Sequence, residues 1–284
     1  MDLSVIVVTY NSGAHIAECM ASVARPPGAL ATETLVVDNA SADDTVGRVR
    51  REAPGARLIE MGENAGYARA VNRGLAESTG EFAFVLNPDC VVHAGAIEAL
   101  YAWMRAHPRC AIAGPRIRNP DGSVEFSARS FPGPFTFLFN RYSLLTRIWP
   151  GNPWSRRYLL SDWDHASDRS VDWLSGAAMF VRRAAVAEVG GMDEAFFMFN
   201  EDVDWCHRMK DAGWSIDFVA SPGVTHAVGA SRRHVPERVI LERHRGMIRY
   251  LRKHHPLPAP IDGAAAAFIM LRARWMLVMN ALRH

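Results

Sequence analysis

Cysteine is scarce in this sequence, and its placement excludes one class of protein. The 284 residues contain 4 cysteines, scattered without any C-x-x-C pair. A small fold held by disulfides is therefore excluded, and the pattern is typical of reduced thiols in a cytosolic protein. Hydrophobic residues make up 49% and charged residues 22%, which also excludes disordered, collagen-like and coiled-coil chains. We expect a folded cytoplasmic protein.

Long apolar runs and phosphate-binding glycine motifs are also missing. Arg272 and Arg274 interrupt the apolar segment near the C-terminus, so no run reaches the roughly 18 residues that a membrane-spanning helix needs. Neither G-x-G-x-x-G nor G-x-x-x-x-G-K-[ST] occurs, which leaves dinucleotide and P-loop phosphate sites unsupported. A bound phosphate would therefore have to be neutralised by a divalent cation or by arginines.

Charge is almost balanced overall but is unevenly distributed. The formal net charge is +2, from 32 basic and 30 acidic side chains, which excludes a globally basic protein that coats nucleic acid. Residues 232–284 hold 11 basic and 3 acidic side chains, whereas residues 1–231 hold 21 and 27. We therefore divide the chain into a body, 1–231, and a basic tail, 232–284, that is expected to meet something anionic.

Short apolar runs and helical patterns alternate over the first third of the chain. Strands are expected at 3–8, 34–37, 57–61 and 81–86, and helices at 14–24, 42–52, 67–80 and 94–106. This alternation predicts an α/β fold with a parallel sheet covered by helices. Ligands of such sheets bind beyond the carboxyl ends of the strands. The polar residues that follow these strands are Thr9, Tyr10, Asn11, Asp38, Asn39, Asn64 and Asp89.

The later part of the chain is less regular. Residues 131–165 are rich in aromatic side chains and are broken by Pro and Gly, so that a core segment and an acceptor cleft are equally supported. Further expected elements are a strand at 171–182, a helix at 202–212, a basic helix within 232–255, a linker at 256–260 and a final amphipathic helix. The basic segment and the helix with Trp275 favour an anionic membrane surface over simple solubility.

The densest group of acids is Glu201, Asp202 and Asp204. A helix N-terminus explains one of these carboxylates, but three within four positions repel one another unless a cation lies near. Acids at a helix N-terminus are held rigidly, which suits a general base that must reach a hydroxyl group. The capping and catalytic interpretations are equally supported by this segment alone.

Asp89 and His226 are candidate metal ligands. An Asp after Pro88 is common in turns, but its place at a predicted strand end, beside other polar strand ends, favours a hard oxygen ligand. A single histidine is more often structural, although its imidazole is also a frequent metal ligand. Arg232 and Arg233 follow His226 and either contact phosphate oxygens or face solvent.

Seven short motifs occur in order, and together they resemble the inverting glycosyltransferases of family 2. The motifs are Ser4–Asn11, Val37–Ser41, Asn64–Tyr67 with Asn72, Asn87–Asp89, Trp173–Ala177, Met192–Asp204, and His226 with Ser231. The similarity covers roughly residues 2–231. Within the family, the Asn-Pro-Asp, Trp-Leu-Ser-Gly and Glu-Asp-Val-Asp segments are most similar to rhamnosyltransferases that act on polyprenyl-diphosphate-linked N-acetylglucosamine.

The resemblance implies a fold and a set of site residues. The fold is GT-A, a Rossmann-like mixed sheet flanked by helices, with a nucleotide-sugar half at about 1–90, an acceptor half at about 91–231 and a C-terminal helical tail. Asp202 falls at the position of the catalytic base, and Glu201 and Trp173 near the acceptor. Asp89 and His226 would hold Mg²⁺ or Mn²⁺. The implied nucleotide-sugar-binding residues are Thr9, Tyr10, Asn11, Asp38, Asn64, Asn72, Asp89 and Arg232.

The resemblance also implies partners. The donor is expected to be dTDP-rhamnose and the acceptor a polyprenyl-diphosphate-linked saccharide, at the inner face of the cell membrane. A transferase that uses a UDP-sugar, with galactofuranose or N-acetylglucosamine, has the same motifs and stays open. A non-catalytic protein that binds lipid or nucleic acid is the alternative of another class, although no aromatic-interleaved nucleic-acid motif supports it.

Overall fold

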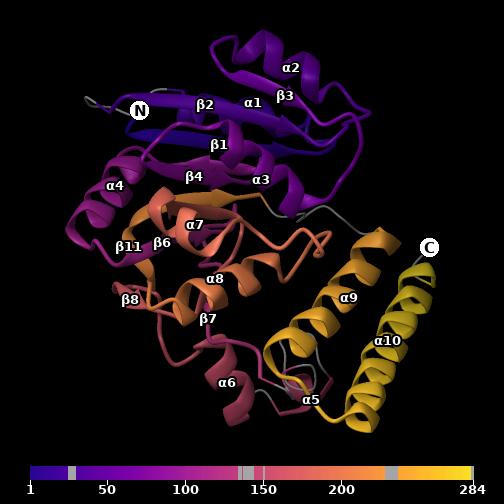
Figure 1. The fold of residues 1–284 in the computed structure, drawn as a ribbon. Helices are drawn as coiled ribbons and strands as arrows, with labels where there is room; N and C mark the ends of the chain where they lie inside the picture. The colour runs from indigo at the N-terminus through magenta and orange to yellow at the C-terminus, as the bar shows by residue number, and fades with distance from the viewer. Residues whose placement is uncertain (25–29, 134–135, 137–143, 150, 228–235, 283–284) are drawn as a thin grey trace.

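The computed structural model describes residues 1–24, 30–133, 136, 144–149, 151–227 and 236–282. Within this described part, nine strands form one mixed sheet in the order β3-β2-β1-β4-β10-β6-β11-β5, with β8 beside β11 (Figure 1). β7 and β9 form a separate pair. The strands are β1 (Leu3–Thr9), β2 (Thr32–Asp38), β3 (Arg57–Glu60), β4 (Phe82–Leu86), β5 (Cys90–Val92), β6 (Cys110–Arg118), β7 (Ala128–Arg129), β8 (Arg169–Ser170), β9 (Trp173–Leu174), β10 (Ala178–Arg182) and β11 (Ser215–His226).

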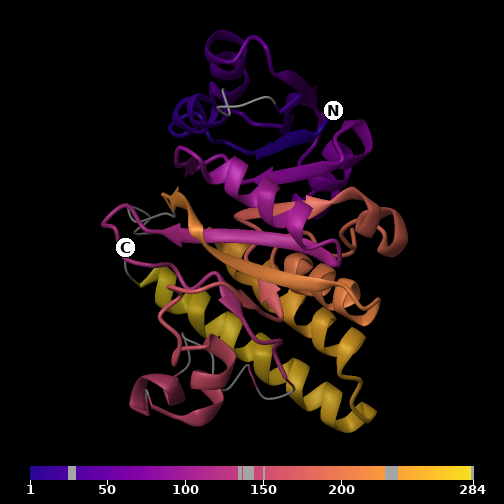
Figure 2. The same ribbon diagram turned by 90° about the vertical axis from the view of Figure 1, so that its left-hand side faces the viewer.

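Helices cover both faces of the sheet, which makes three layers (Figures 1 and 2). The helices are α1 (Ile16–Val23), α2 (Thr45–Glu52), α3 (Tyr67–Glu77), α4 (Ala96–Ala106), α5 (Leu144–Ile148), α6 (Pro153–Leu159), α7 (Arg183–Val189), α8 (Glu201–Asp211), α9 (Glu237–His254) and α10 (Ala259–Ala281). Alternate residues of β1 belong to different cores, because successive side chains of a strand point to opposite faces. Val5 and Val7 pack with α1 and α4, whereas Ile6 and Val8 pack with α3 and α8.

The predicted alternation of strands and helices in the first 106 residues is confirmed. β1, β2, β3 and β4 are mutually parallel where they pair, and Thr9 at the end of β1 lies opposite Asp38 at the end of β2. The predicted ends differ from the observed ones by a few residues, as at α1, which begins at Ile16 rather than at residue 14. The carboxyl ends of these strands therefore meet at one edge, as expected.

The single strand predicted at 171–182 is wrong, because the segment changes sheets. β9 pairs with β7, while β10 lies antiparallel between β4 and β6 in the main sheet. Residues Ser175–Ala177 form the turn between them: Ser175 N–H donates to the Ser127 carbonyl, and the Ala177 carbonyl accepts from Asn87 N–H. Both pieces are buried, so the apolar pattern did not reveal the break. This turn is central to the site described below.

The aromatic segment 131–165 is divided between core and surface. Phe131, Tyr158 and Trp163 pack against the buried core. Trp149 and Trp154 are exposed and meet edge to face. The remaining aromatic residues of the segment, at 135, 137, 139 and 142, lie outside the described residues. The core interpretation is thus confirmed for three of the rings.

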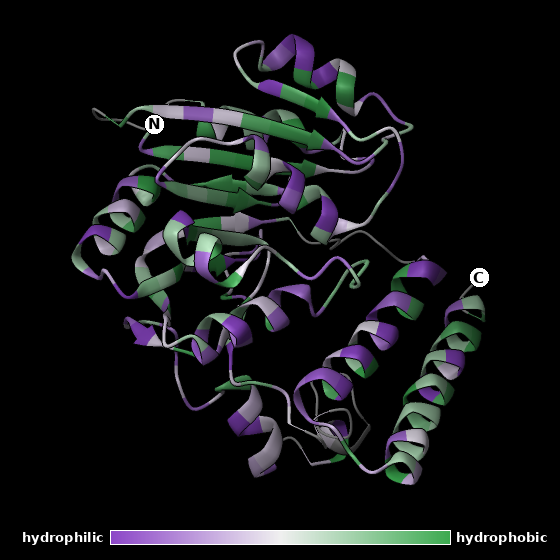
Figure 3. Cartoon of the chain, in the orientation of Figure 1, coloured by the Kyte–Doolittle hydropathy of each residue, from purple (hydrophilic) through white to green (hydrophobic). Residues whose placement is uncertain are grey.

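The basic tail forms two long helices that lie side by side, α9 against the body and α10 outside it (Figures 1 and 2). The predicted boundary at residue 231 falls among residues 228–235, outside the described part. α10 differs from the expected amphipathic helix, because it is apolar on both sides (Figure 3). Ile269 and Ala273 are buried, whereas Leu271 and Trp275 are 65% and 63% exposed. None of the described helices is both long and apolar enough to cross a membrane.

A buried ionic network joins α8 to α9. The Asp204 carboxylate is fully buried and binds Arg208 at 2.9 Å, Lys253 at 2.9 Å and His254 at 2.8 Å. Burial opposes ionisation, but the hydrogen bonds from Lys253, His254 and Arg208 hold the pKa of Asp204 below its ordinary value. Because Lys253 and His254 come from α9, the network ties the tail to the helix that carries Glu201 and Asp202.

We expect Asp204→Asn to destabilise the protein by about 3 kcal/mol, because it removes the carboxylate from a buried network and leaves the largely buried Arg208 without its counter-charge. Urea unfolding followed by circular dichroism measures the difference. The lowered pKa means that the carboxylate contributes above its unfolded-state pKa, so the difference should shrink as the pH falls below about 4. Asp262→Asn is the control, since its ion pair with Arg252 is exposed and should contribute less than about 1 kcal/mol. An equal loss in the two variants would contradict the role of burial.

Candidate active site

Two of the predicted nucleotide-sugar residues lock the ends of β1 and β2 together. Thr9 Oγ1 donates to Asp38 Oδ1 at 2.9 Å, and both residues are buried. The same carboxylate accepts from the hydroxyl of Ser41 at 2.6 Å and from its backbone N–H at 2.9 Å. These hydrogen bonds hold Asp38 rigidly at the strand ends and use most of the acceptor capacity of its carboxylate.

The loops beside these strand ends are tied by asparagines. Asn11 has a left-handed backbone with φ 50°, and its Oδ1 accepts from Ala42 N–H at 2.7 Å. Asn39 Nδ2 donates to Asn64 Oδ1 at 3.0 Å, which fixes the loop before α3. Tyr10 projects from the end of β1 and is 50% exposed, so its ring is available to a ligand. The structure therefore places Thr9, Tyr10, Asn11, Asp38 and Asn64 at one edge of the sheet.

Asn72 lies elsewhere. Its Nδ2 donates to the Met192 carbonyl at 2.8 Å, and its Oδ1 accepts from Met192 N–H at 2.8 Å. Both polar atoms are used to hold the loop that leads to α8. Asn72 thus positions that loop, and the structure gives no support to a direct contact with the donor.

Asp89 and His226 are brought together, although 137 positions separate them in the chain. β5 follows Asp89 and pairs antiparallel with the end of β11, where His226 lies opposite Cys90. Asp89 Oδ1 is 3.2 Å from His226 Nε2, and Glu125 Oε2 is 3.0 Å from His226 Nδ1. Burial opposes a charged imidazole, but Asp89 and Glu125 raise the pKa of His226 to about 9. His226 in turn lowers the pKa of Asp89 against the effect of burial.

This pair suits a divalent cation. Ligand atoms that bind Mg²⁺ at about 2.1 Å and at right angles are about 3 Å apart, which matches the separation of Asp89 Oδ1 and His226 Nε2. Glu125 orients the other ring nitrogen, as carboxylates do behind metal-binding histidines. Cys90 lies beside the pair, but burial raises the pKa of its thiol well above the ordinary value and Sγ contacts the Ala177 carbonyl. A neutral thiol is a poor ligand, so Asp89 and His226 are the residues that would hold the ion.

Asp202 is the second residue of α8 and faces the turn Ser175–Ala177. Its Oδ2 accepts from Gly176 N–H at 2.9 Å, and its Oδ1 accepts from Val203 N–H at 2.9 Å. Tyr67 fixes the other side of this peptide by donating its hydroxyl to the Gly176 carbonyl at 2.7 Å. Burial raises the pKa of Asp202, and the two backbone hydrogen bonds offset part of that increase. A raised pKa brings the carboxylate closer to the strength that a base needs near neutral pH.

Glu201 precedes Asp202 and has a different environment. The residue is 5% exposed, and its Oε2 is buried without a hydrogen-bond partner in the described part of the chain. Burial, followed by repulsion from Asp202, raises the pKa of Glu201 well above its ordinary value. Burial and the neighbouring carboxylate therefore both disfavour the charged form of Glu201.

The turn Ser175–Ala177 connects the two groups of acids. Gly176 N–H binds Asp202, and the next residue, Ala177, accepts through its carbonyl from Asn87 N–H two positions before Asp89. One short turn thus contacts both Asp202 and the loop that carries Asp89.

The structure does not support the acceptor contact predicted for Trp173. Trp173 is 6% exposed, its indole N–H donates to the Ser130 carbonyl and Arg129 covers its ring, so it supports the site from within the core and offers little surface to an acceptor. Arg232 lies outside the described residues.

Sequence reasoning assigned no role to Glu125, Tyr67 and Gly176. Tyr67 and Gly176 lie in motifs already singled out, whereas nothing in the sequence marked Glu125.

Comparison with known proteins follows this geometry. Residues 4–164 match the family model described as Glycosyl transferase family 2. The chain is 36% identical over 300 residues to the N-acetylglucosaminyl-diphospho-decaprenol L-rhamnosyltransferase of Mycobacterium tuberculosis, an alignment that covers 99% of this chain and 94% of that protein. It is 28% identical over 213 residues to the low-salt glycan biosynthesis hexosyltransferase Agl10 of Haloferax volcanii, covering 74% of this chain and 62% of that protein.

Solved structures show the same fold. The mannosyltransferase PcManGT of Pyrobaculum calidifontis, in complex with GDP-Man and Mn²⁺, has a TM-score of 0.60 at 21% identity and covers 99% of this chain and 73% of its own. S. aureus TarS 1-349 in complex with UDP has a TM-score of 0.54 at 17% identity, covering 95% and 71%. The predicted GT-A fold is confirmed.

Proposed function

Because this chain belongs to glycosyl transferase family 2, we propose that it transfers L-rhamnose from dTDP-rhamnose to a hydroxyl group of polyprenyl-diphosphate-linked N-acetylglucosamine. The observation that supports it best is the position of Asp202, which is held by Gly176 one residue from the contact that Ala177 makes with the loop of Asp89. The similarity to the M. tuberculosis rhamnosyltransferase over nearly the whole chain supports the sugar and the acceptor.

The mechanism is a single displacement with inversion at the anomeric carbon. Asp202 accepts the proton of the acceptor hydroxyl as that oxygen attacks from the face opposite the nucleotide. General base help of this kind contributes about 10²–10⁴-fold. Mg²⁺ or Mn²⁺, held by Asp89 and His226, would supply positive charge to the departing diphosphate. Thr9, Asp38 and Asn64 hold the strand ends against which the donor nucleotide lies.

Turnover with a panel of donors tests the choice of sugar. The wild-type chain is given dTDP-rhamnose, UDP-galactofuranose or UDP-N-acetylglucosamine, with the same lipid-diphosphate-linked N-acetylglucosamine as acceptor. We expect transfer from dTDP-rhamnose to exceed the others. Transfer from a UDP-sugar alone would select the alternative within the family. The non-catalytic alternative is not supported, because the chain is a glycosyltransferase.

We propose that the outer face of α10 rests on the membrane surface that carries the acceptor, at the inner face of the cell membrane. Phe268, Leu271, Trp275 and Val278 are all exposed, at spacings of three and four residues that place them on one side of the helix. Arg274 lies on this exposed side as well. Apolar side chains flanked by basic ones suit a surface of anionic lipid.

Vesicle sedimentation checks this surface. Leu271→Ser with Trp275→Ser should reduce the fraction of protein that pellets with phosphatidylglycerol vesicles severalfold, since about 1.5–3 kcal/mol of apolar burial is lost per large side chain. Ile148→Ser with Trp149→Ser is the matched control, because these residues are similarly exposed but lie at the end of α5 rather than on α10. If both double variants pellet like the wild type, the membrane contact of α10 is wrong.

A further inference from the structure

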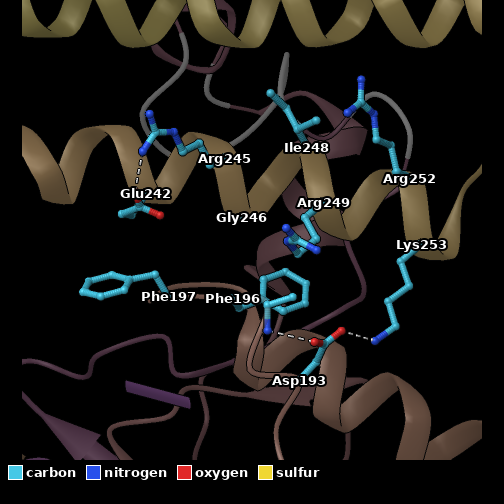
Figure 4. Close-up of a pocket in the computed structure, with 11 residues that line it drawn as sticks. Asp193, Phe196, Phe197, Glu242, Arg245, Gly246, Ile248, Arg249, Arg252 and Lys253 are labelled. Carbon is cyan, nitrogen blue, oxygen red and sulfur yellow. Dashed lines mark hydrogen bonds and ion pairs between the residues drawn. The ribbon is translucent and has the colours of Figure 1, made fainter. Parts of the chain in front are cut away.

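A pocket of about 650 Å³ lies between α9 and the loop that precedes α8 (Figure 4). Its volume falls within the roughly 300–1,000 Å³ typical of small-molecule sites. One wall is α9, with Arg245, Arg249 and Arg252, and the other is the loop that carries Phe196 and Phe197. None of the predicted catalytic, substrate-binding or metal-binding residues lines this pocket, although its loop wall belongs to the motif Met192–Asp204.

The pocket adjoins the predicted base through the loop of residues 193–200. On one side of this loop, the Phe197 carbonyl accepts from Tyr67 N–H at 2.7 Å. On the other side α9 approaches so closely that a Cβ on Gly246 would lie 2.5 Å from the Phe199 carbonyl oxygen. The loop then continues directly into Glu201 and Asp202. A ligand in the pocket would therefore contact the loop that leads directly to the proposed base.

The pocket is lined by four basic side chains and two carboxylates, so its excess of two positive charges favours a doubly charged anion. Arg245, Arg249 and Arg252 lie on one face of α9, at spacings of four and three residues. Arg245 is paired with Glu242 and Arg252 with Asp262. Arg249 has no carboxylate partner in the described part of the chain. It points towards the ring of Phe196, 5.8 Å from the ring centroid (Figure 4).

Apolar side chains line the pocket beside these basic groups. Phe196 and Phe197 form the floor, and Ile248 lines the pocket from α9. α10 packs outside α9 and presents Phe268, Leu271 and Trp275 to the outside. The pocket therefore offers both basic and apolar contacts to a ligand with a charged head and an apolar chain.

We propose that this pocket binds the diphosphate group of an isoprenoid-diphosphate-linked acceptor, with Arg249 as its main contact. This inference rests on the proposed function and adds the subsite that recognises the lipid-linked diphosphate. A guanidinium binds two phosphate oxygens in parallel, which suits an arginine that no carboxylate holds. The isoprenoid chain leaves along α10 towards the membrane.

Calorimetric titration of the full chain with farnesyl diphosphate in EDTA tests the subsite. The chelator removes the cation that a diphosphate would need at Asp89 and His226, so binding reports on the arginines. Arg249→Gln should raise the Kd at least about tenfold, as expected for one charge-assisted contact. Arg105→Gln, which removes the same charge from the exposed surface of α4, should leave the Kd unchanged. Equal effects of the two substitutions would overturn the proposal.

Competitors identify the source of the diphosphate. Inorganic pyrophosphate should bind more weakly than farnesyl diphosphate, and phosphatidylglycerol micelles at equal phosphate concentration should not displace it. Pyrophosphate that binds as tightly would mean a site for the free anion, and displacement by the micelles would mean a site for any acidic phospholipid. Either result would overturn the assignment to an isoprenoid diphosphate.

Kinetics separates this inference from the proposed function. The wild type and Arg249→Gln are compared on farnesyl-diphospho-N-acetylglucosamine and on octyl N-acetylglucosaminide, which lacks the diphosphate. Arg249→Gln should raise KM at least about tenfold for the first acceptor only, with the donor KM unchanged. A similar change for both acceptors would overturn the diphosphate subsite. Failure of the wild type to use either acceptor would overturn the proposed function, while calorimetry would still decide whether the pocket binds a diphosphate.

Discussion

Asp202→Asn should lower kcat by about 10²–10⁴-fold while the nucleotide-sugar donor still binds. The amide keeps the size of the carboxylate but cannot take up the proton of the acceptor hydroxyl. The contact with Gly176 N–H persists through the remaining oxygen, so the turn Ser175–Ala177 should stay in place. Single-turnover kinetics with dTDP-rhamnose, together with donor titration, separates the loss of chemistry from a loss of binding.

Two further variants decide whether the loss is specific to this base. Asp211→Asn, on the exposed end of α8, should turn over like the wild type. Glu201→Gln should have a smaller effect than Asp202→Asn, because Glu201 is buried and takes up no proton in the proposed displacement. A larger loss in Glu201→Gln would move the base to Glu201. Activity of Asp202→Asn within tenfold of the wild type would exclude Asp202 as the base.

Asp89→Asn should remove the dependence of donor binding on Mg²⁺ or Mn²⁺. Residues that only orient a metal ligand typically contribute about 10–100-fold to metal affinity, so a direct ligand should contribute at least as much. Donor affinity of the wild type should fall when EDTA is added, whereas Asp89→Asn should bind the donor weakly with or without the chelator. Titration of dTDP-rhamnose in the two conditions measures this.

Glu125→Gln and Glu81→Gln complete this series. Glu125 contacts His226 Nδ1, so its substitution should weaken metal affinity by about tenfold without removing the site. Glu81 is exposed and precedes β4 at the end opposite the site, and its substitution should change nothing. Equal dependence on EDTA in the wild type and in Asp89→Asn would show that Asp89 does not hold the ion.

The strand-end part of the site was predictable because local signals define it. β-branched runs mark β1, β2 and β4, and parallel strands place their polar ends at one edge. Asp89 and Asp202 also carry short-range signals, one after a strand and one at a helix start. For these residues, the pattern along the chain and the packing in space point to the same positions.

The rest depends on contacts between distant segments, which no local pattern reports. Glu125 meets His226 only because β11 returns to the edge of the sheet beside β5. Asn72 looked like a donor residue, yet its amide holds Met192 on a loop that starts over 110 positions later. One wall of the pocket depends on Gly246, which lets α9 approach the Phe199 carbonyl oxygen. A glycine within a basic helix does not indicate which distant segment packs against it.

The order of the strands also bears on how this protein is made. β10 lies between β4 and β6, but its residues leave the ribosome long after Leu86 ends β4. At typical rates of about 5–20 residues per second, the roughly 90 intervening residues take on the order of 5–20 s to synthesise. During that interval the apolar edge of β4 has no strand beside it and is open to pairing with other nascent chains. A chaperone that shields the emerging N-terminal half would therefore raise the yield more than one that acts on the completed chain.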